Sequence, residues 1–216
     1  MIIYFVRHAS AGQKKLSGKK DEKRPLDADG VQQCTQMGRV LSSMEVGVDA
    51  IISSPLKRAT QTAALIANEI GYEGKLHIEN ALRPEAKYDH FRDMLRDYSK
   101  HEAIMVVGHN PNFSDFLGRI VAGSGERAHV DMRKGSVARI ESKQKKYVLD
   151  WLITPRLAKA AADAGAMEER PSGLENGAGA EFEIPDEYLS HRSNIAGDMN
   201  QDSARTTKSR PKTSRK

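Results

Sequence analysis

Three polar motifs, each directly after an apolar run, carry residue types that could bind and transfer a phosphoryl group. The first is Arg7-His8, the second is the segment 53–63 with Arg58, and the third is Gly108-His109. A neutral imidazole can attack phosphorus, and a guanidinium can hold two oxygens of a tetrahedral oxyanion. Each motif alone is also compatible with an ordinary strand end or a surface charge. Two histidines and two arginines brought together would favour phosphate chemistry.

The apolar runs before these motifs have the length of strands. Residues 1–6, 49–54 and 103–108 are rich in Ile, Val and aromatic side chains, which is typical of strands buried on both faces. In an open α/β sheet, ligands bind at the carboxyl ends of the parallel strands. The sequence therefore predicts that the three motifs meet at one edge of one sheet.

Helical and further strand patterns alternate with these runs. A turn over 25–30 precedes a helix whose apolar stripe is Val31, Cys34, Met37, Leu41 and Met44. A second helix is expected to begin at Pro55 and to end at Gly71. Further helices are expected over 87–100 and through 113–121, and further strands over 75–79, 136–141 and 147–153. This alternation predicts an α/β fold: a three-layer, mostly parallel sheet with helices on both faces.

The segment 10–25 is expected to be a loop that leaves the first strand at its carboxyl end. It holds six basic residues against two acidic ones. The loop is either simply solvated or forms a basic rim that attracts a phosphorylated substrate.

Composition excludes several classes of protein. The chain has 216 residues, 38% apolar content and a net charge of +5. Cys34 is the single cysteine and falls on a helical stripe, so we expect a packed thiol and no disulfide framework or thiolate metal cluster. No signal peptide is recognisable, and no apolar run approaches the ~20 residues that span a bilayer. We expect a cytoplasmic protein without a membrane partner.

The composition changes near residue 157. Residues 160–187 carry a net charge of −7, and residues 188–216 carry +5. Few large apolar residues occur there, so the buried surface would not offset the ordering entropy. The sequence predicts a folded domain over 1–157 and a disordered tail over 158–216, with an optional docking element around 182–185. The basic end, 205–216, is either a solubilising tail or a contact for acidic surfaces; direct nucleic-acid binding rests on it alone and is disfavoured.

The three ordered motifs resemble those of the histidine phosphatase superfamily, which has the phosphoglycerate mutase-like fold. The resemblance covers about residues 1–157. Within the superfamily, Arg24-Pro25-Leu26 and the segment 107–111 look like those of SixA-type phosphohistidine phosphatases. The resemblance implies a metal-independent phosphatase without a cofactor, because a cationic pocket supplies the positive charge.

Residue roles follow from the same resemblance. His8 would be the nucleophile that forms a phosphohistidine intermediate, and Arg7, Arg58 and His109 would clamp the phosphoryl oxygens. Three more candidates for contacts to the phosphate are Ser10, Arg24 and Asn110. Ala9 stands where the family usually has glycine, and alanine is tolerated there unless φ is positive. Glu85 is either a general acid for the leaving group or an ordinary loop carboxylate.

The connection over 86–101 has room for one helix, whereas larger members of the family place a capping insertion there. An open phosphate site suits a phosphate on a protein surface better than a small metabolite, which needs burial of most of its surface. The leading hypothesis is therefore removal of phosphate from phosphohistidine on a phosphotransfer protein. The alternatives are a phosphatase of small phosphoesters or nucleotides and a non-catalytic phosphate-binding scaffold. The sequence gives no oligomeric state.

Overall fold

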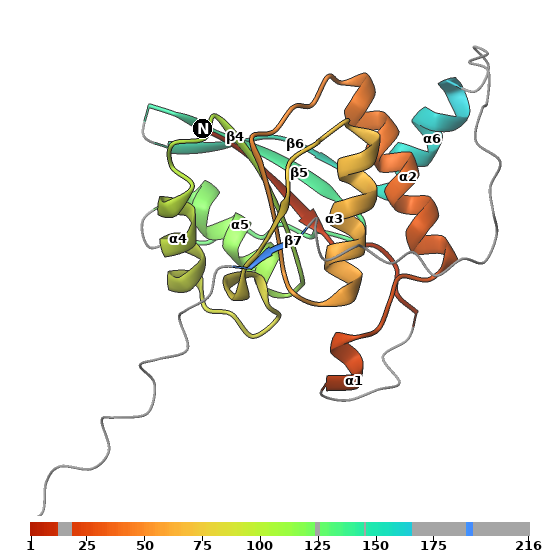
Figure 1. The fold of residues 1–216 in the computed structure, drawn as a ribbon. Coiled ribbons are helices and arrows are strands. Elements are labelled where there is room, and N and C mark those ends of the chain that lie inside the picture. Colours follow the sequence, from red (N-terminus) through yellow and green to blue (C-terminus); the bar gives the residue numbers. More distant parts are fainter. Residues whose placement is uncertain (13–18, 124–125, 145, 166–188, 192–216) are drawn as a thin grey trace, which may run out of the picture.

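The computed structural model describes residues 1–12, 19–123, 126–144, 146–165 and 189–191. A seven-stranded sheet runs through this part of the chain in the order β6-β5-β1-β4-β2-β3-β7 (Figure 1). The strands are β1 (Ile2–Arg7), β2 (Ala50–Ser53), β3 (Leu76–Ile78), β4 (Ala103–Gly108), β5 (Val137–Lys143), β6 (Lys146–Ile153) and β7 (Leu189–His191). The helices are α1 (Lys19–Glu22), α2 (Ala28–Ser43), α3 (Lys57–Glu69), the 3₁₀ helix η1 (Asn80–Leu82), α4 (Tyr88–Asp97), α5 (Asn112–Ala122) and α6 (Pro155–Gly165).

The centre of the sheet is parallel. β4 pairs in parallel with β1 on one side and with β2 on the other, and β3 continues this arrangement. β5 runs antiparallel to β1 and to β6. The prediction of a mostly parallel α/β sheet is therefore confirmed, and the expected strand over 103–108 coincides with β4.

Helices cover both faces of the sheet, which explains why the central strands are apolar without alternation. Tyr4 and Val6 of β1 pack with α2, α3 and Ala158 of α6 on one face. Ile3 and Phe5 pack with α4 and α5 on the other face (Figure 1). Because both sets of side chains are buried, β1 is held rigidly between two cores up to the point where Arg7-His8 begins.

The expected stripe of the first long helix is correct in its middle and wrong at its ends. Cys34, Met37 and Leu41 of α2 are buried, whereas Val31 and Met44 are 40% and 43% exposed. The buried face also runs through Gly30 and Gly38. A count of apolar side chains misses these two glycines, and Met44 lies at the C-cap, beyond the last helical turn.

Other element boundaries also differ from expectation. α3 begins at Lys57, with Leu56 as its N-cap, so Pro55 does not open the helix as expected. The predicted loop 10–25 contains the short helix α1. The expected boundary at 157 falls inside α6, where Ala158 is buried against α2 and α3. β7 extends the sheet within the predicted tail 158–216, while the possible docking element at 182–185 and the basic end 205–216 lie outside the described residues.

We expect Gly30→Ala to destabilise the protein by about 2–4 kcal/mol. A Cβ atom at Gly30 would lie 1.9 Å from the carbonyl oxygen of Ser10 and 2.9 Å from its carbonyl carbon. Both atoms belong to the backbone, so either α2 or the loop after β1 has to move. Urea denaturation measures the loss of stability.

Gly47→Ala is the matched control, because no atom lies within 4 Å of the position of its Cβ. We expect that variant to stay within about 0.5 kcal/mol of the wild type. Equal midpoints for the two variants would show that α2 does not pack against the Ser10 backbone.

Candidate active site

The ends of three neighbouring strands bring three of the predicted residues together. His8 follows β1, and its backbone N–H donates to the carbonyl oxygen of Gly108 at 2.9 Å. His109 follows β4, and the ring centroids of the two histidines are 4.9 Å apart. Arg58, in the first turn of α3, donates from Nε to Nε2 of His8 at 3.3 Å. The expected convergence of the three motifs at one sheet edge is therefore observed.

His8 is held as a neutral imidazole with one defined tautomer. Its Nδ1 lies 2.8 Å from the carbonyl oxygen of Ala9. A carbonyl can only accept, so Nδ1 carries the hydrogen and Nε2 keeps the lone pair. Burial, followed by the positive charges of Arg58 and Arg7, lowers the pKa of His8 to about 3. At neutral pH Nε2 is thus unprotonated and accepts from the guanidinium of Arg58.

His109 is buried beside His8 and is also neutral. It is 2% exposed, and its Nε2 lies 2.8 Å from the hydroxyl oxygen of Ser54. Burial and the neighbouring His8 and Arg58 lower the pKa of His109 to about 2. Within the described part of the chain, its Nδ1 has no hydrogen-bond partner. With the hydrogen on Nδ1 and the Ser54 hydroxyl donating to Nε2, this buried N–H can donate to a bound oxyanion.

The two arginines supply the positive charge. Arg58 is 5% exposed, and its Nη1 donates to the backbone oxygen of Asp21 at 3.0 Å. Arg7 donates from Nη1 to the carbonyl oxygen of Met132 at 2.7 Å, and its Nε has no partner among the described residues. Burial lowers the pKa of both groups from its usual range, but arginine stays charged in proteins. This edge of the sheet therefore carries two charged guanidinium groups beside two neutral imidazoles.

Ser10, Arg24 and Asn110 hold the surrounding loops in place. The hydroxyl of Ser10 donates to Asp27 at 2.9 Å, and Asp27 is the N-cap of α2. Arg24 pairs with Asp21 through Nε at 2.8 Å and also donates to the carbonyl oxygen of Ala11.

Asn110 donates to the carbonyl oxygen of Met132 at 2.9 Å, the same oxygen that Arg7 holds. These side chains position the backbone around His8, and a direct contact to phosphate remains a prediction for all three. Ala9, which replaces the usual glycine, is buried and does not have a positive φ, so the alanine is accommodated without backbone strain.

Glu85 is not part of the histidine cluster. Its side chain is 70% exposed and lies 3.6 Å from Arg83, which also pairs with Glu22 of α1 at 2.9 Å. No contact of Glu85 with His8, Arg58 or His109 occurs among the described residues. This geometry is that of a loop carboxylate at the surface.

Several supporting residues were not expected. Thr62 accepts from the backbone N–H of Ala9 at 3.1 Å and donates to the carbonyl oxygen of Arg58 at 2.8 Å, so it links the loop after β1 to α3. Its place four residues after Arg58 is a usable signal, because the two lie on one helical face. Met132 contributes only its backbone oxygen to the site, so no residue type at this position could have indicated the contact.

Neither a metal cluster nor a membrane span is found in the described part of the chain. No group of three or more His, Cys, Asp or Glu side chains there could hold a metal ion. No helix among the described residues is both long and apolar enough to cross a bilayer.

Comparisons with known proteins agree with this geometry. An uncharacterized protein of Picosynechococcus sp. is 26% identical over 145 residues, which is 66% of this chain and 86% of the relative. The structure of the protein histidine phosphatase SixA complexed with tungstate covers 72% of this chain and 98% of its own, with a TM-score of 0.64 and 19% identity. The alpha-ribazole phosphatase from Shigella flexneri covers 72% and 97%, with a TM-score of 0.56 and 20% identity. Both structures share the fold. Residues 3–103, just under half of the chain, match the family model of the histidine phosphatase superfamily (branch 1).

Proposed function

We propose that this protein is a phosphatase that works through a covalent phosphohistidine at His8. The observation that carries the proposal is the state of His8: its Nδ1–H is fixed on the Ala9 carbonyl, and its Nε2 lone pair lies 3.3 Å from Arg58 Nε. A neutral, oriented imidazole beside guanidiniums is suited to attack a phosphoryl group whose oxygens the cations hold.

The reaction has two displacements. In the first, Nε2 of His8 forms a bond to phosphorus while the bond from phosphorus to the leaving group breaks, and the leaving group keeps the electron pair and takes a proton from solvent. In the second, water attacks the phosphorus and gives up a proton to solvent, the P–Nε2 bond breaks with its electron pair returning to Nε2, and inorganic phosphate leaves His8 as a neutral imidazole. Arg7, Arg58 and Nδ1 of His109 would hold the phosphoryl oxygens in both steps.

Phosphohistidine on a phosphotransfer protein is the proposed substrate. Between Glu85 and β4 the chain forms α4 and no capping insertion, so no further element stands over the site from that connection. Glu85 is exposed and pairs with Arg83, so the site has little acid assistance for an alkoxide leaving group. The P–N bond of phosphohistidine needs less such help. The fold shared with SixA agrees with this choice, and the fold shared with an alpha-ribazole phosphatase supports small phosphoesters as the second candidate.

The test is phosphate release without added metal from a phosphohistidine-bearing phosphotransfer protein and from an aryl phosphate, side by side. We expect faster release from the phosphoprotein. Faster release from the aryl phosphate would favour a phosphatase of small phosphoesters. No release from either substrate would favour the non-catalytic, phosphate-binding scaffold.

Glu85→Gln belongs to the same experiment, since it removes the acid and keeps the shape of the side chain. We expect the variant to change the rate on either substrate by less than about twofold, because an exposed carboxylate at a surface ion pair contributes little. A loss on the aryl phosphate of the size typical of general acids, about 10²-fold or more, would assign the acid to Glu85.

A further inference from the structure

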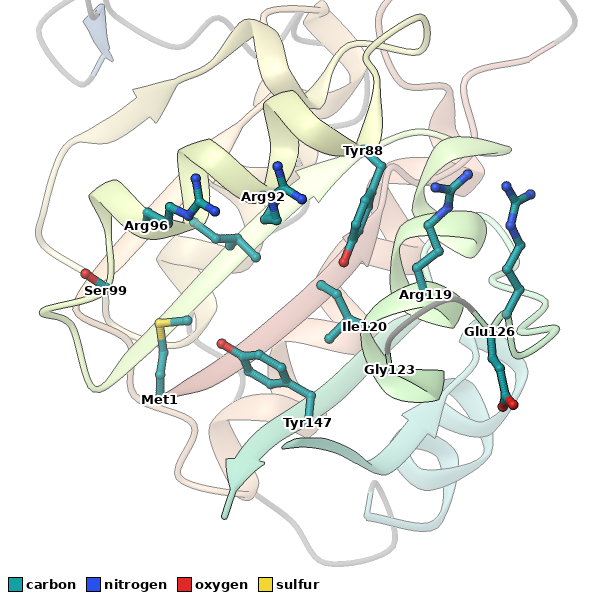
Figure 2. Close-up of a pocket in the computed structure, with 12 residues that line it drawn as sticks. Met1, Tyr88, Arg92, Arg96, Ser99, Arg119, Ile120, Gly123, Glu126 and Tyr147 are labelled. Carbon is teal, nitrogen blue, oxygen red and sulfur yellow. The ribbon is translucent and has the colours of Figure 1, made fainter. Parts of the chain in front are cut away.

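A second cavity lies between α4 and α5, away from the histidine cluster. Its volume is about 670 Å³, within the range of about 300–1,000 Å³ that is typical of small-molecule sites. Met1 and Tyr147 line its floor (Figure 2). Met1 precedes β1 and His8 follows it, so at about 3.3 Å per residue the two sites are separated by the length of a strand. We call this cavity the α4/α5 groove.

The rim of the α4/α5 groove is cationic. Four arginines line it from α4, from α5 and from the segment after α5, and Glu126 is the one carboxylate among the lining residues. The arginines are Arg92, Arg96, Arg119 and Arg127. Each arginine also pairs with an aspartate beside the groove, namely Asp89, Asp93 or Asp115.

Two of these arginines, Arg92 and Arg96, remain available to a ligand, whereas Arg119 is held by Asp115 at 2.9 Å. Arg92 and Arg96 pair with acidic residues three positions earlier on α4, at side-chain exposures of 49% and 68%. Ion pairs this exposed contribute little, so an anion in the groove can compete for the guanidiniums.

The floor of the groove is apolar and aromatic. Leu95 and Ile120 line it as well. The half-buried rings of Tyr88 and Tyr147 also line the groove (Figure 2). The guanidinium of Arg119 lies 5.2 Å from the centroid of the Tyr88 ring, a cation–π geometry. A flat aromatic and apolar surface beside cations suits a planar ligand that carries a negative charge.

We propose that the α4/α5 groove binds a small aromatic anion of the nucleoside monophosphate class. The aromatic ring would lie on the floor between the tyrosines, and the phosphate would pair with Arg92 and Arg96. A small molecule fits the cavity better than a protein partner, because specific protein interfaces cover at least about 1,000 Å² in total. The site is independent of phosphoryl transfer at His8.

Binding of adenosine 5′-monophosphate to full-length His8→Gln protein tests the proposal, since this background prevents turnover. Calorimetry is run with and without excess inorganic phosphate, which fills the catalytic site. We expect the double variant Arg92→Gln/Arg96→Gln to bind about tenfold more weakly. Adenosine, which lacks the phosphate, should bind more weakly by a similar factor.

Arg39→Gln is the matched control, because Arg39 is an equally exposed arginine on α2 and lies outside the groove. Its affinity should be unchanged, and the urea midpoints of all variants should coincide. Binding that inorganic phosphate abolishes and the double variant retains would place the nucleotide at the catalytic site and overturn the proposal. Binding of an acidic Glu/Phe peptide without binding of the nucleotide would assign the groove to a protein partner and overturn it as well.

Discussion

His8→Gln is expected to lower the rate of phosphate release by a factor of about 10³–10⁵. Glutamine is polar and similar in reach, so the Arg58 guanidinium keeps a neighbour, but an amide nitrogen has no lone pair with which to attack phosphorus. The loss should appear in the chemical step, because the variant keeps Arg7, Arg58 and His109, the proposed contacts to the phosphoryl group. The measurement is single-turnover phosphate release at saturating substrate.

The covalent step can be observed directly. Wild-type protein mixed briefly with a radiolabelled substrate should carry an acid-labile label, and His8→Gln should carry none. His90→Gln is the control, since His90 is an exposed histidine on α4 that lies outside the cluster. If the His8→Gln protein carried as much radioactive label as the wild type, the nucleophile would be a residue other than His8.

The histidine and arginine cluster could be predicted from the sequence because each of its members directly follows, or lies within a few residues of, the end of an apolar strand. β1, β2 and β4 are continuous apolar runs, and a sheet covered on both faces leaves few other arrangements for them. His8, Arg58 and His109 therefore had to meet once the strands were parallel neighbours. The role of Thr62 was within reach of the same reasoning, because it shares a face of α3 with Arg58.

The remaining differences between the predicted and the observed structure come from contacts that a pattern of side-chain types does not indicate. The backbone oxygen of Met132 accepts from both Arg7 and Asn110, and any residue type at position 132 could supply it. The buried face of α2 includes Gly30, whose close approach to the Ser10 backbone replaces the apolar contact expected from Val31. β7 pairs with β3 through the backbone, so its pairing depends on an open sheet edge more than on its three side chains.

Stability is expected to fall steeply on acidification below pH 6.5, because two buried histidines resist protonation. Burial first, and then the neighbouring cationic side chains, lowers the pKa of His8 to about 3 and that of His109 to about 2 in the folded protein. In the unfolded chain a histidine takes up a proton near pH 6.5. Between these limits the unfolded state binds more protons, so the free energy of unfolding decreases as pH falls. Each histidine contributes a slope of about 1.4 kcal/mol per pH unit between pH 5.5 and 4.

Urea denaturation from pH 6.5 to pH 4.5 measures this slope. Half-buried carboxylates such as Asp27 change stability in the same direction. Partial burial raises the pKa of Asp27, but its hydrogen bonds with Gly30, Ser10 and Gly12 together lower it further, so the pKa lies below its usual value. The informative quantity is therefore the difference in slope between variants. His8→Gln and His109→Gln should each reduce the slope by about 1.4 kcal/mol per pH unit. His90→Gln, which replaces an exposed histidine outside the cluster, is the control. Equal slopes for wild type and His8→Gln would mean that His8 binds its proton over the same pH range in the folded and the unfolded protein. Burial would then not be what keeps His8 neutral, and the proposed mechanism would lose the argument that rests on a buried, unprotonated Nε2.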